Sequence, residues 1–448
     1  MPADIPTTPP LRTTCSDGFL LGLESLMRRT GQGRHLAATV LECEGSPDIA
    51  RIRHAAESLG RNHPILRAKN ARSKKDWIAR WQTDGEAPAP VPLQLWHLPG
   101  VPAEGTEIPS LEELIHRVIN GTDIDIHEPG PNLLFHVLVL SPDRWALVLA
   151  WSHSLMDAVG MTKLLQLLAS ESHDPADTPP SGEPAASPSV SELYKQAYPM
   201  IEEMRKFPSW RPRSLHRKGA RPGASRFHVA RFGREETAVI RAKMAATAGE
   251  LLLLPYFACC AARAVQAVIA ARFPEEGASV LLSLPVQRQS DPAKRPLFSN
   301  HMIPYTLLLT PEELAELKPA TSALYRKYAD FMRRKLPAAM HALMQMMERC
   351  PSRFYNLPAF IYMRGEICSL FHSHTGAFVP GAESMFGSRI ANGYHVPSVS
   401  APPGIGIFFS EHDGQLTMTL SWKDGCLSLL ELELLKETLA QDLGTPVP

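Results

Sequence analysis

The sequence lacks the cysteine pattern of a disulfide-stapled or zinc-binding protein. Its 448 residues include only seven cysteines, an odd number, and no two of them form a C-x-x-C pair. Paired, regularly spaced cysteines are the usual sign of disulfide frameworks and structural zinc sites. We therefore expect reduced thiols, as in a cytoplasmic protein.

The chain also lacks an excess of charge of either sign. Lys plus Arg and Asp plus Glu both number 46, so no overall field favours nucleic acid or an anionic surface as a partner. The apolar fraction of 44% and the charged fraction of 21% are those of an ordinary globular protein. The length exceeds the ~100–200 residues of a single domain, so we expect two domains.

No segment has the length and apolar character of a membrane span. The longest apolar run, residues 251–271, contains Pro255 and Arg263 and fits a buried core helix better. The first ten residues include an acidic residue and four prolines but no apolar segment, so we predict no signal peptide. We expect a cytoplasmic protein, with peripheral membrane contact as an alternative.

Several common catalytic motifs are missing. There is no P-loop, no G-x-G-x-x-G after a predicted strand, no G-x-S-x-G and no H-E-x-x-H. His372 and His374 are spaced to share one side of a strand, but no carboxylate or cysteine stands directly beside them. We expect neither a metal nor a bound cofactor.

Helix and strand patterns form two blocks. We predict a first lobe over residues 1–170, a linker over 171–225 and a second lobe over 226–448. Residues 171–188 are rich in Pro, Ser and Asp, which is typical of a linker. Residues 205–234 contain ten Lys or Arg and no acidic residue. This basic segment is either a solvated linker or a docking surface for the phosphates of coenzyme A or for an acidic acyl-carrier protein.

A histidine lies between a predicted strand and a predicted helix in the first block. Residues 144–151 alternate in polarity as a strand does, and residues 159–168 have an amphipathic helical pattern. His153 follows the strand, and Asp157 stands where a carboxylate can cap the helix. A neutral imidazole there can take a proton from a hydroxyl or amine that attacks a carbonyl. The spacing fits a core histidine beside an N-cap aspartate equally well.

Four motifs follow one another along the chain. They are residues 61–67 (RNHPILR), 152–158 (SHSLMDA), 283–288 (SLPVQR) with 298–300 (FSN), and 375–380 with 404–416. In this order they resemble the R-H-P-x-L-R segment, the HHxxxDG signature, the P-V-S-x-R…G-N segment and the S-N-V-P-G…Y-D-G-x-L segment of one superfamily. It comprises chloramphenicol acetyltransferase, peptide-synthetase condensation domains and the wax ester synthase/diacylglycerol acyltransferases. The resemblance spans nearly the whole chain.

The resemblance implies an α/β (α+β) fold of two chloramphenicol acetyltransferase-like lobes in a V with a central tunnel. It makes His153 the general base, and Asp157 a structural residue that pairs with an arginine of the second lobe. Arg288 is the candidate, because it occupies the family's strand-end arginine position. Further tunnel or oxyanion candidates are Ser152, Gly160, Asn300 and Thr375; Asn300 lines the tunnel or fixes a loop near it.

Two positions depart from the signature. Ser152 replaces its first histidine, and Ala158 replaces its glycine, although Gly160 lies two residues on. If that glycine supplies an unusual backbone angle, Ala158 has to do without it.

The function that the resemblance implies is acyl transfer. An acyl group would move from acyl-CoA or a phosphopantetheinyl acyl carrier, as co-substrate, to a hydroxyl or amine acceptor in lipid or secondary-metabolite biosynthesis. The alternative is a non-catalytic, condensation-like scaffold that binds a carrier protein or lipid. We expect a monomer.

Overall fold

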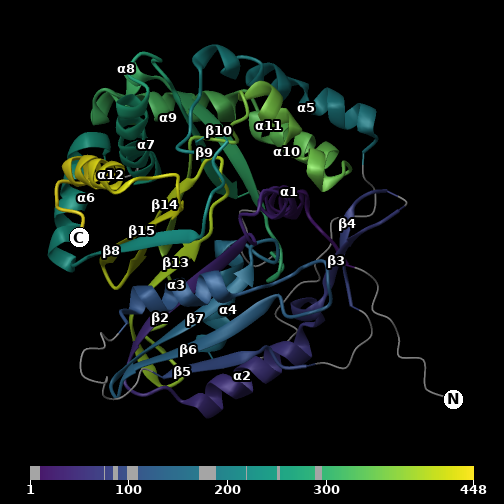
Figure 1. Ribbon diagram of the computed structural model, residues 1–448, viewed down its shortest axis with the longest axis vertical. Helices are drawn as coiled ribbons and strands as arrows, with labels where there is room; N and C mark the ends of the chain where they lie inside the picture. Colours follow the sequence, from purple (N-terminus) through teal and green to yellow (C-terminus); the bar gives the residue numbers. More distant parts are fainter. Residues whose placement is uncertain are drawn as a thin grey trace.

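Two six-stranded sheets organise the molecule into two lobes, the second above the first in Figure 1. The computed structural model describes residues 11–74, 76–83, 89–97, 109–170, 188–217, 219–249, 253–287 and 295–448. Both lobes combine a mixed sheet with helices, which confirms the predicted α/β class.

The first-lobe sheet is built around β7, which leads to His153. Leu147, Leu149 and Trp151 face α2 (Ile49–Asn62) and α4 (Ala158–Ala169). The alternate residues of β7 face α3 (Leu111–Gly121). The alternation in the sequence therefore reflects a strand covered on both faces. In spatial order the strands are β12 (Ser384–Met385), β13 (Ser388–Pro397), β2 (Leu36–Glu44), β7 (Arg144–Ser152), β6 (Leu133–Ser141) and β5 (Leu93–His97).

The second-lobe sheet packs one face against a large helical layer. The predicted apolar core helix is α7 (Leu253–Arg272), which is buried there. No helix in the described ranges is long and apolar enough to cross a membrane. The strands are, in order, β10 (Met302–Leu309), β9 (Val280–Gln287), β11 (Leu370–Ala377), β14 (Ile405–His412), β15 (Gln415–Lys423) and β8 (Ser225–Phe232).

The remaining elements complete the two lobes. Asp413-Gly414, within the last of the four motifs, forms the hairpin turn between β14 and β15. Other helices are α6 (Arg234–Ala248), α8 (Pro311–Leu314), α9 (Leu317–Arg333), α11 (Leu357–Tyr362) and α12 (Leu429–Leu443). Short 3-10 turns are η1 (Pro64–Arg67) and η3 (Phe207–Trp210), and a small sheet contains β1 (Leu11–Arg12), β4 (Ala79–Gln82) and β3 (Lys69–Arg72).

The lobes do not follow the predicted boundaries at residues 170 and 226. β13 comes from the second block but pairs with β2 in the first-lobe sheet, because its apolar side chains complete that lobe's core. α1 (Cys15–Arg29), from the first block, packs against α10 (Leu336–Met347) and η5 (Ser352–Phe354) of the second. Each of the two sequence blocks thus contributes an element that packs with the other lobe.

The helix expected within the linker belongs to the second lobe. α5 (Val190–Met204) packs along α10, and its buried side chains join the second-lobe core. Pro199 lies inside this helix without ending it. The tertiary packing of α5 compensates for the hydrogen bond that the proline cannot donate.

Candidate functional site

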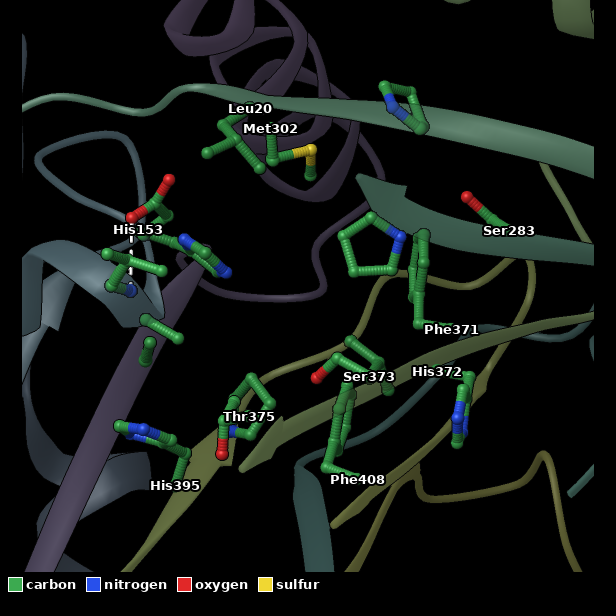
Figure 2. Close-up of a pocket in the computed structure, with 18 of the residues that line it drawn as sticks. Leu20, His153, Ser283, Met302, Phe371, His372, Ser373, Thr375, His395 and Phe408 are labelled. Carbon is green, nitrogen blue, oxygen red and sulfur yellow. Dashed lines mark hydrogen bonds between the residues drawn. The ribbon is translucent and has the colours of Figure 1, made fainter. Parts of the chain in front are cut away.

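A cavity of about 390 Å³ lies where the two lobes meet. The first lobe contributes Trp151, His153, Ala158 and other residues of β2, α4 and β13, and the second contributes residues of β9, β10, β11, β14 and β15. Aromatic and aliphatic side chains make up most of the wall that Figure 2 shows. A cavity therefore lies at the place where the resemblance predicts a central tunnel.

His153 reaches this cavity from the turn that follows β7. Its backbone N–H donates to the carbonyl of His35 at 3.0 Å. The indole of Trp151 donates to the carbonyl of Met156 at 3.1 Å, which closes the turn. The imidazole points into the cavity (Figure 2) and keeps partial exposure to it. The strand end thus presents the ring as the sequence pattern suggested.

The surroundings of His153 favour its neutral form. Burial lowers the pKa of His153 from its ordinary value of 6.5, while backbone hydrogen bonds and the carboxylate of Asp157 partly oppose the shift. A neutral imidazole is the form that can accept a proton. The residue is therefore ready for general-base chemistry near pH 7.

Asp157 orients the turn. It is the N-cap of α4, and its Oδ1 accepts hydrogen bonds from the N–H groups of Val159 at 3.1 Å and Gly160 at 3.0 Å. Its Oδ2 lies 2.6 Å from the guanidinium of Arg295 and accepts a further bond from the N–H of His301 at 3.1 Å. With both oxygens engaged, this carboxylate positions the turn and the helix that flank His153.

The second-lobe arginine that pairs with Asp157 is Arg295. Arg288, the predicted partner, lies outside the described residues. Arg295 reaches Asp157 from the segment that precedes β10, and the Nζ of Lys163 on α4 donates to its carbonyl at 2.9 Å. The predicted type of pair is present, with an arginine seven residues further along the chain.

Ala158 and Gly160 have different backbone roles. Ala158 is the first residue of α4 and has no positive φ, so an alanine fits there without strain. A Cβ on Gly160 would lie 2.6 Å from the carbonyl oxygen of Leu297. The glycine is thus needed for a close approach between the lobes, and the departure at Ala158 leaves the turn intact.

Asn300 fixes a loop next to the site. Its side-chain Nδ2 donates to Asp17 Oδ1 at 2.8 Å and to the carbonyl of Ser154 at 3.2 Å. It is fully buried and is not among the described residues that line the cavity. Of its two predicted roles, the structure shows the loop-fixing one.

The other candidates differ in their access to the cavity. Thr375 lines it from β11, but its hydroxyl donates to the carbonyl of Phe409 at 3.3 Å. Ser152 is buried at the end of β7, opposite Leu36 of β2. Among the described residues, Ser152 and Gly160 are not part of the cavity wall. Thr375 is therefore the one of these three that a substrate can contact.

Two further histidines lie beside His153. The ring of His35 stacks on that of His153, with centroids 5.0 Å apart and planes at 28°. His395 lines the cavity from β13, and its Nδ1 lies 2.8 Å from the hydroxyl of Thr39. Burial lowers the pKa of His395 to about 4 and that of His35 well below its ordinary value. The pairing of β2 with β7 and of β13 with β2 brings the three histidines together, so no local motif signals the cluster.

Known proteins share this architecture. No family model and no curated protein sequence matches the chain. A solved trichothecene 15-O-acetyltransferase from Fusarium sporotrichioides is 11% identical with a TM-score of 0.66, over 96% of this chain and 94% of that one. The first condensation domain of the CDA synthetase is 15% identical with a TM-score of 0.60, over 99% and 98%. Polyketide synthase associated protein 5 from Mycobacterium tuberculosis is 14% identical with a TM-score of 0.58, over 98% of each chain.

The chain has the fold that this acetyltransferase and the condensation domain share. The predicted architecture of two acetyltransferase-like lobes is thereby confirmed over nearly the full length. In this acyltransferase fold the described residues contain no cluster of three or more histidine, cysteine or acidic side chains that could hold a metal ion.

The basic segment of this acyltransferase fold is not a free cationic surface. β8 takes up residues 225–232, and seven of the ten basic residues between 205 and 234 form ion pairs. The pairs are Arg205–Glu202, Lys206–Glu203, Arg213–Glu276, Arg217–Glu431, Arg226–Asp424, Arg231–Glu42 and Arg234–Asp413. Most of the charge expected to dock phosphate or a carrier protein is thus already neutralised by the protein itself.

Proposed function

We propose that the protein transfers an acyl group from a CoA or carrier-protein thioester to a hydroxyl or amine acceptor, with His153 as the general base. The observation that carries the proposal is the position of the neutral His153 ring on a cavity walled by both lobes. The fold, shared with an acetyltransferase and with condensation domains, supports it.

The proposed reaction needs no covalent intermediate on the protein. The imidazole of His153 takes the proton from the acceptor as its oxygen or nitrogen attacks the thioester carbonyl. The tetrahedral intermediate then collapses, the carbon–sulfur bond breaks, and the proton on His153 passes to the departing thiolate. A base of this kind contributes roughly 10²–10⁴-fold to the rate.

The neighbouring residues support this assignment of roles. Both oxygens of Asp157 are engaged, so that residue holds the turn and is not available as a base. The stacked ring of His35 restricts rotation of the His153 ring. Both contacts keep the base in place before substrate arrives, which lowers the cost of reaching the reactive geometry.

A thioester panel tests the proposal. Acyl-CoA esters from acetyl to decanoyl would be incubated with the protein, with and without a mixture of primary alcohols and amines, and free thiol would be measured. Acceptor-dependent thiol release is the expected result. Binding of a thioester without any thiol release would instead favour the non-catalytic scaffold.

A further inference from the structure

A buried histidine lies at the end of the cavity away from His153. His372 lines the cavity from β11 and is 1% exposed. Pairing of β11 with β9 ends at Phe371, so His372 is the first residue past that contact. Figure 2 shows it beyond Phe371 and Phe408 as seen from His153. A substrate that reaches this end of the cavity meets His372 rather than the proposed base.

One ring nitrogen of His372 has no partner among the residues that the structure describes. Nδ1 lies 3.0 Å from the carbonyl oxygen of Ile407, which can only accept a hydrogen bond, so Nδ1 carries the hydrogen. Burial and the neighbouring His374 lower the pKa of His372 to about 3, so the ring is neutral. Nε2 is then a lone-pair acceptor, and it is buried without a hydrogen bond in the described part of the chain. A buried acceptor without a donor carries a free-energy cost, which a ligand that supplies the donor removes.

The rest of the wall indicates what kind of ligand segment fits. Among the described residues no lysine or arginine lines the cavity, and its single carboxylate, Asp157, is engaged by Arg295. An ionised group would therefore lie here without a counter-charge. The wall near His372 contains the ring of Phe409 and a second histidine, His374, while Ser283 and Ser373 lie on the other side of β11. This surface suits an uncharged, mainly apolar segment.

We propose that this end of the cavity binds an uncharged apolar or aromatic part of a substrate that bears one hydroxyl or N–H group, and that Nε2 of His372 accepts the hydrogen bond from it. The inference names a substrate class and so rests on the proposed function. His372 would determine specificity without touching the reacting atoms. The donor group can belong to the acyl chain or to the acceptor, and the two arms of the experiment separate these sources.

Two substitutions separate the acceptor from the structural anchor. In His372→Asn the amide nitrogen can take the place of Nδ1 and keep the bond to Ile407, while the acceptor at Nε2 is lost. In His372→Gln the amide oxygen can reach the place of Nε2. His412→Asn is the matched control, because His412 lies at the end of β14, outside the cavity wall, with its Nε2 3.2 Å from the carbonyl of Ile390.

Affinity would be measured by calorimetry on the whole protein with matched pairs of probes. One arm compares hexanoyl-CoA with 3-hydroxyhexanoyl-CoA and octanoyl-CoA with 3-hydroxyoctanoyl-CoA. The other compares 2-phenylethanol with 2-(4-hydroxyphenyl)ethanol. In at least one arm the wild-type protein should prefer the hydroxylated member about fivefold to tenfold, the effect of one hydrogen bond. His372→Asn should reduce that ratio to about one, while His372→Gln and His412→Asn should retain it.

The outcomes are distinct. Two results with the wild-type protein would overturn the inference, even if a variant failed to fold. One is equal affinity for both members of every probe pair, and the other is no measurable binding of any probe. An undiminished ratio in a folded His372→Asn protein would also overturn it. The binding measurement does not require turnover. If the protein prefers the hydroxylated probes but never releases thiol, the proposed acyl transfer is refuted while the inference about this binding site is retained.

Discussion

The guanidinium of Arg295 lies 2.6 Å from Oδ2 of Asp157, and the two side chains are only 4% and 6% exposed. The pair joins the segment before β10 in the second lobe to the N-terminus of α4 in the first. Because α4 begins five residues after His153, this contact fixes the proposed base relative to the second-lobe wall of the cavity. Removing one partner would leave the other charge buried and unpaired.

Asp157→Ala should lower the free energy of unfolding by about 3–5 kcal/mol. The change leaves the Arg295 charge buried and removes the helix cap of α4 at the same time. Urea denaturation followed by circular dichroism measures the loss. Arg389→Ala is the control, since its ion pair with Glu44 is exposed to solvent and should contribute little to stability. Full stability of Asp157→Ala would refute the orienting pair.

The coupling within the pair can be measured directly. Asp157→Asn and Arg295→Met, alone and together, form a double-mutant cycle. We expect the double variant to lose less stability than the two single variants combined, with a coupling of about 1–3 kcal/mol. The same urea titrations give the four unfolding free energies. Additive losses would show that the two side chains do not act as a pair.

Gly160 should tolerate no side chain. Gly160→Ala places a Cβ 2.6 Å from the carbonyl oxygen of Leu297, and we expect a loss of about 1–3 kcal/mol, as for overpacking. Ala158→Gly should also be destabilising, by about 0.5–1 kcal/mol, because position 158 is helical and gains nothing from a glycine. Gly121→Ala is the control, since no atom lies within 4 Å of its Cβ. Thermal unfolding compares the three, and a stable Gly160→Ala would contradict the close approach.

Local pattern predicted most of the secondary structure around the site. The strand before His153 and the helix after it both occur within one residue of the predicted bounds. Alternating and helical apolar spacings are set by the side chains that each element buries, so they can be read from the sequence. The order of the four motifs along the chain also predicted the arrangement of the two lobes.

The contacts that complete the site were not predictable in the same way. The resemblance indicated that Asp157 pairs with a second-lobe arginine, but the choice between Arg288 and Arg295 depends on the path of the chain after β9. His35 reaches His153 through the pairing of β2 with β7, and His395 does so only because β13 crosses into the first-lobe sheet. That crossing depends on pairings between segments more than 300 residues apart, which leave no local pattern in the sequence.

The buried histidines should make the protein sensitive to acid. Burial lowers the pKa of His395 to about 4 and also lowers those of His35 and His153. The unfolded chain therefore binds more protons than the folded one below about pH 6.5, and the unfolding free energy should fall as the pH drops from 6.5 toward 4. Urea titrations at pH 7, 5.5 and 4.5 would show a smaller fall for His395→Gln than for the wild-type protein. An equal fall would show that His395 does not contribute.

The pH profile of turnover should reflect the lowered pKa of His153. His153 acts in its neutral form, and burial lowers its pKa from 6.5. As the pH is lowered from 8, kcat/KM should stay constant to about 6.5 and decline only below it. Initial rates of thiol release in a constant-ionic-strength buffer series give the profile. An acid limb centred above pH 7 would contradict a buried, neutral base.

The most direct test compares turnover of His153→Ala with that of the wild-type protein on the best thioester and acceptor pair from the panel. His412→Ala serves as a control outside the cavity, and melting temperatures establish that all three proteins are folded. His153→Ala should lose roughly 10²–10⁴-fold in kcat, while the kcat of His412→Ala should be unchanged. Wild-type turnover in a folded His153→Ala protein would contradict the role of His153 as the general base.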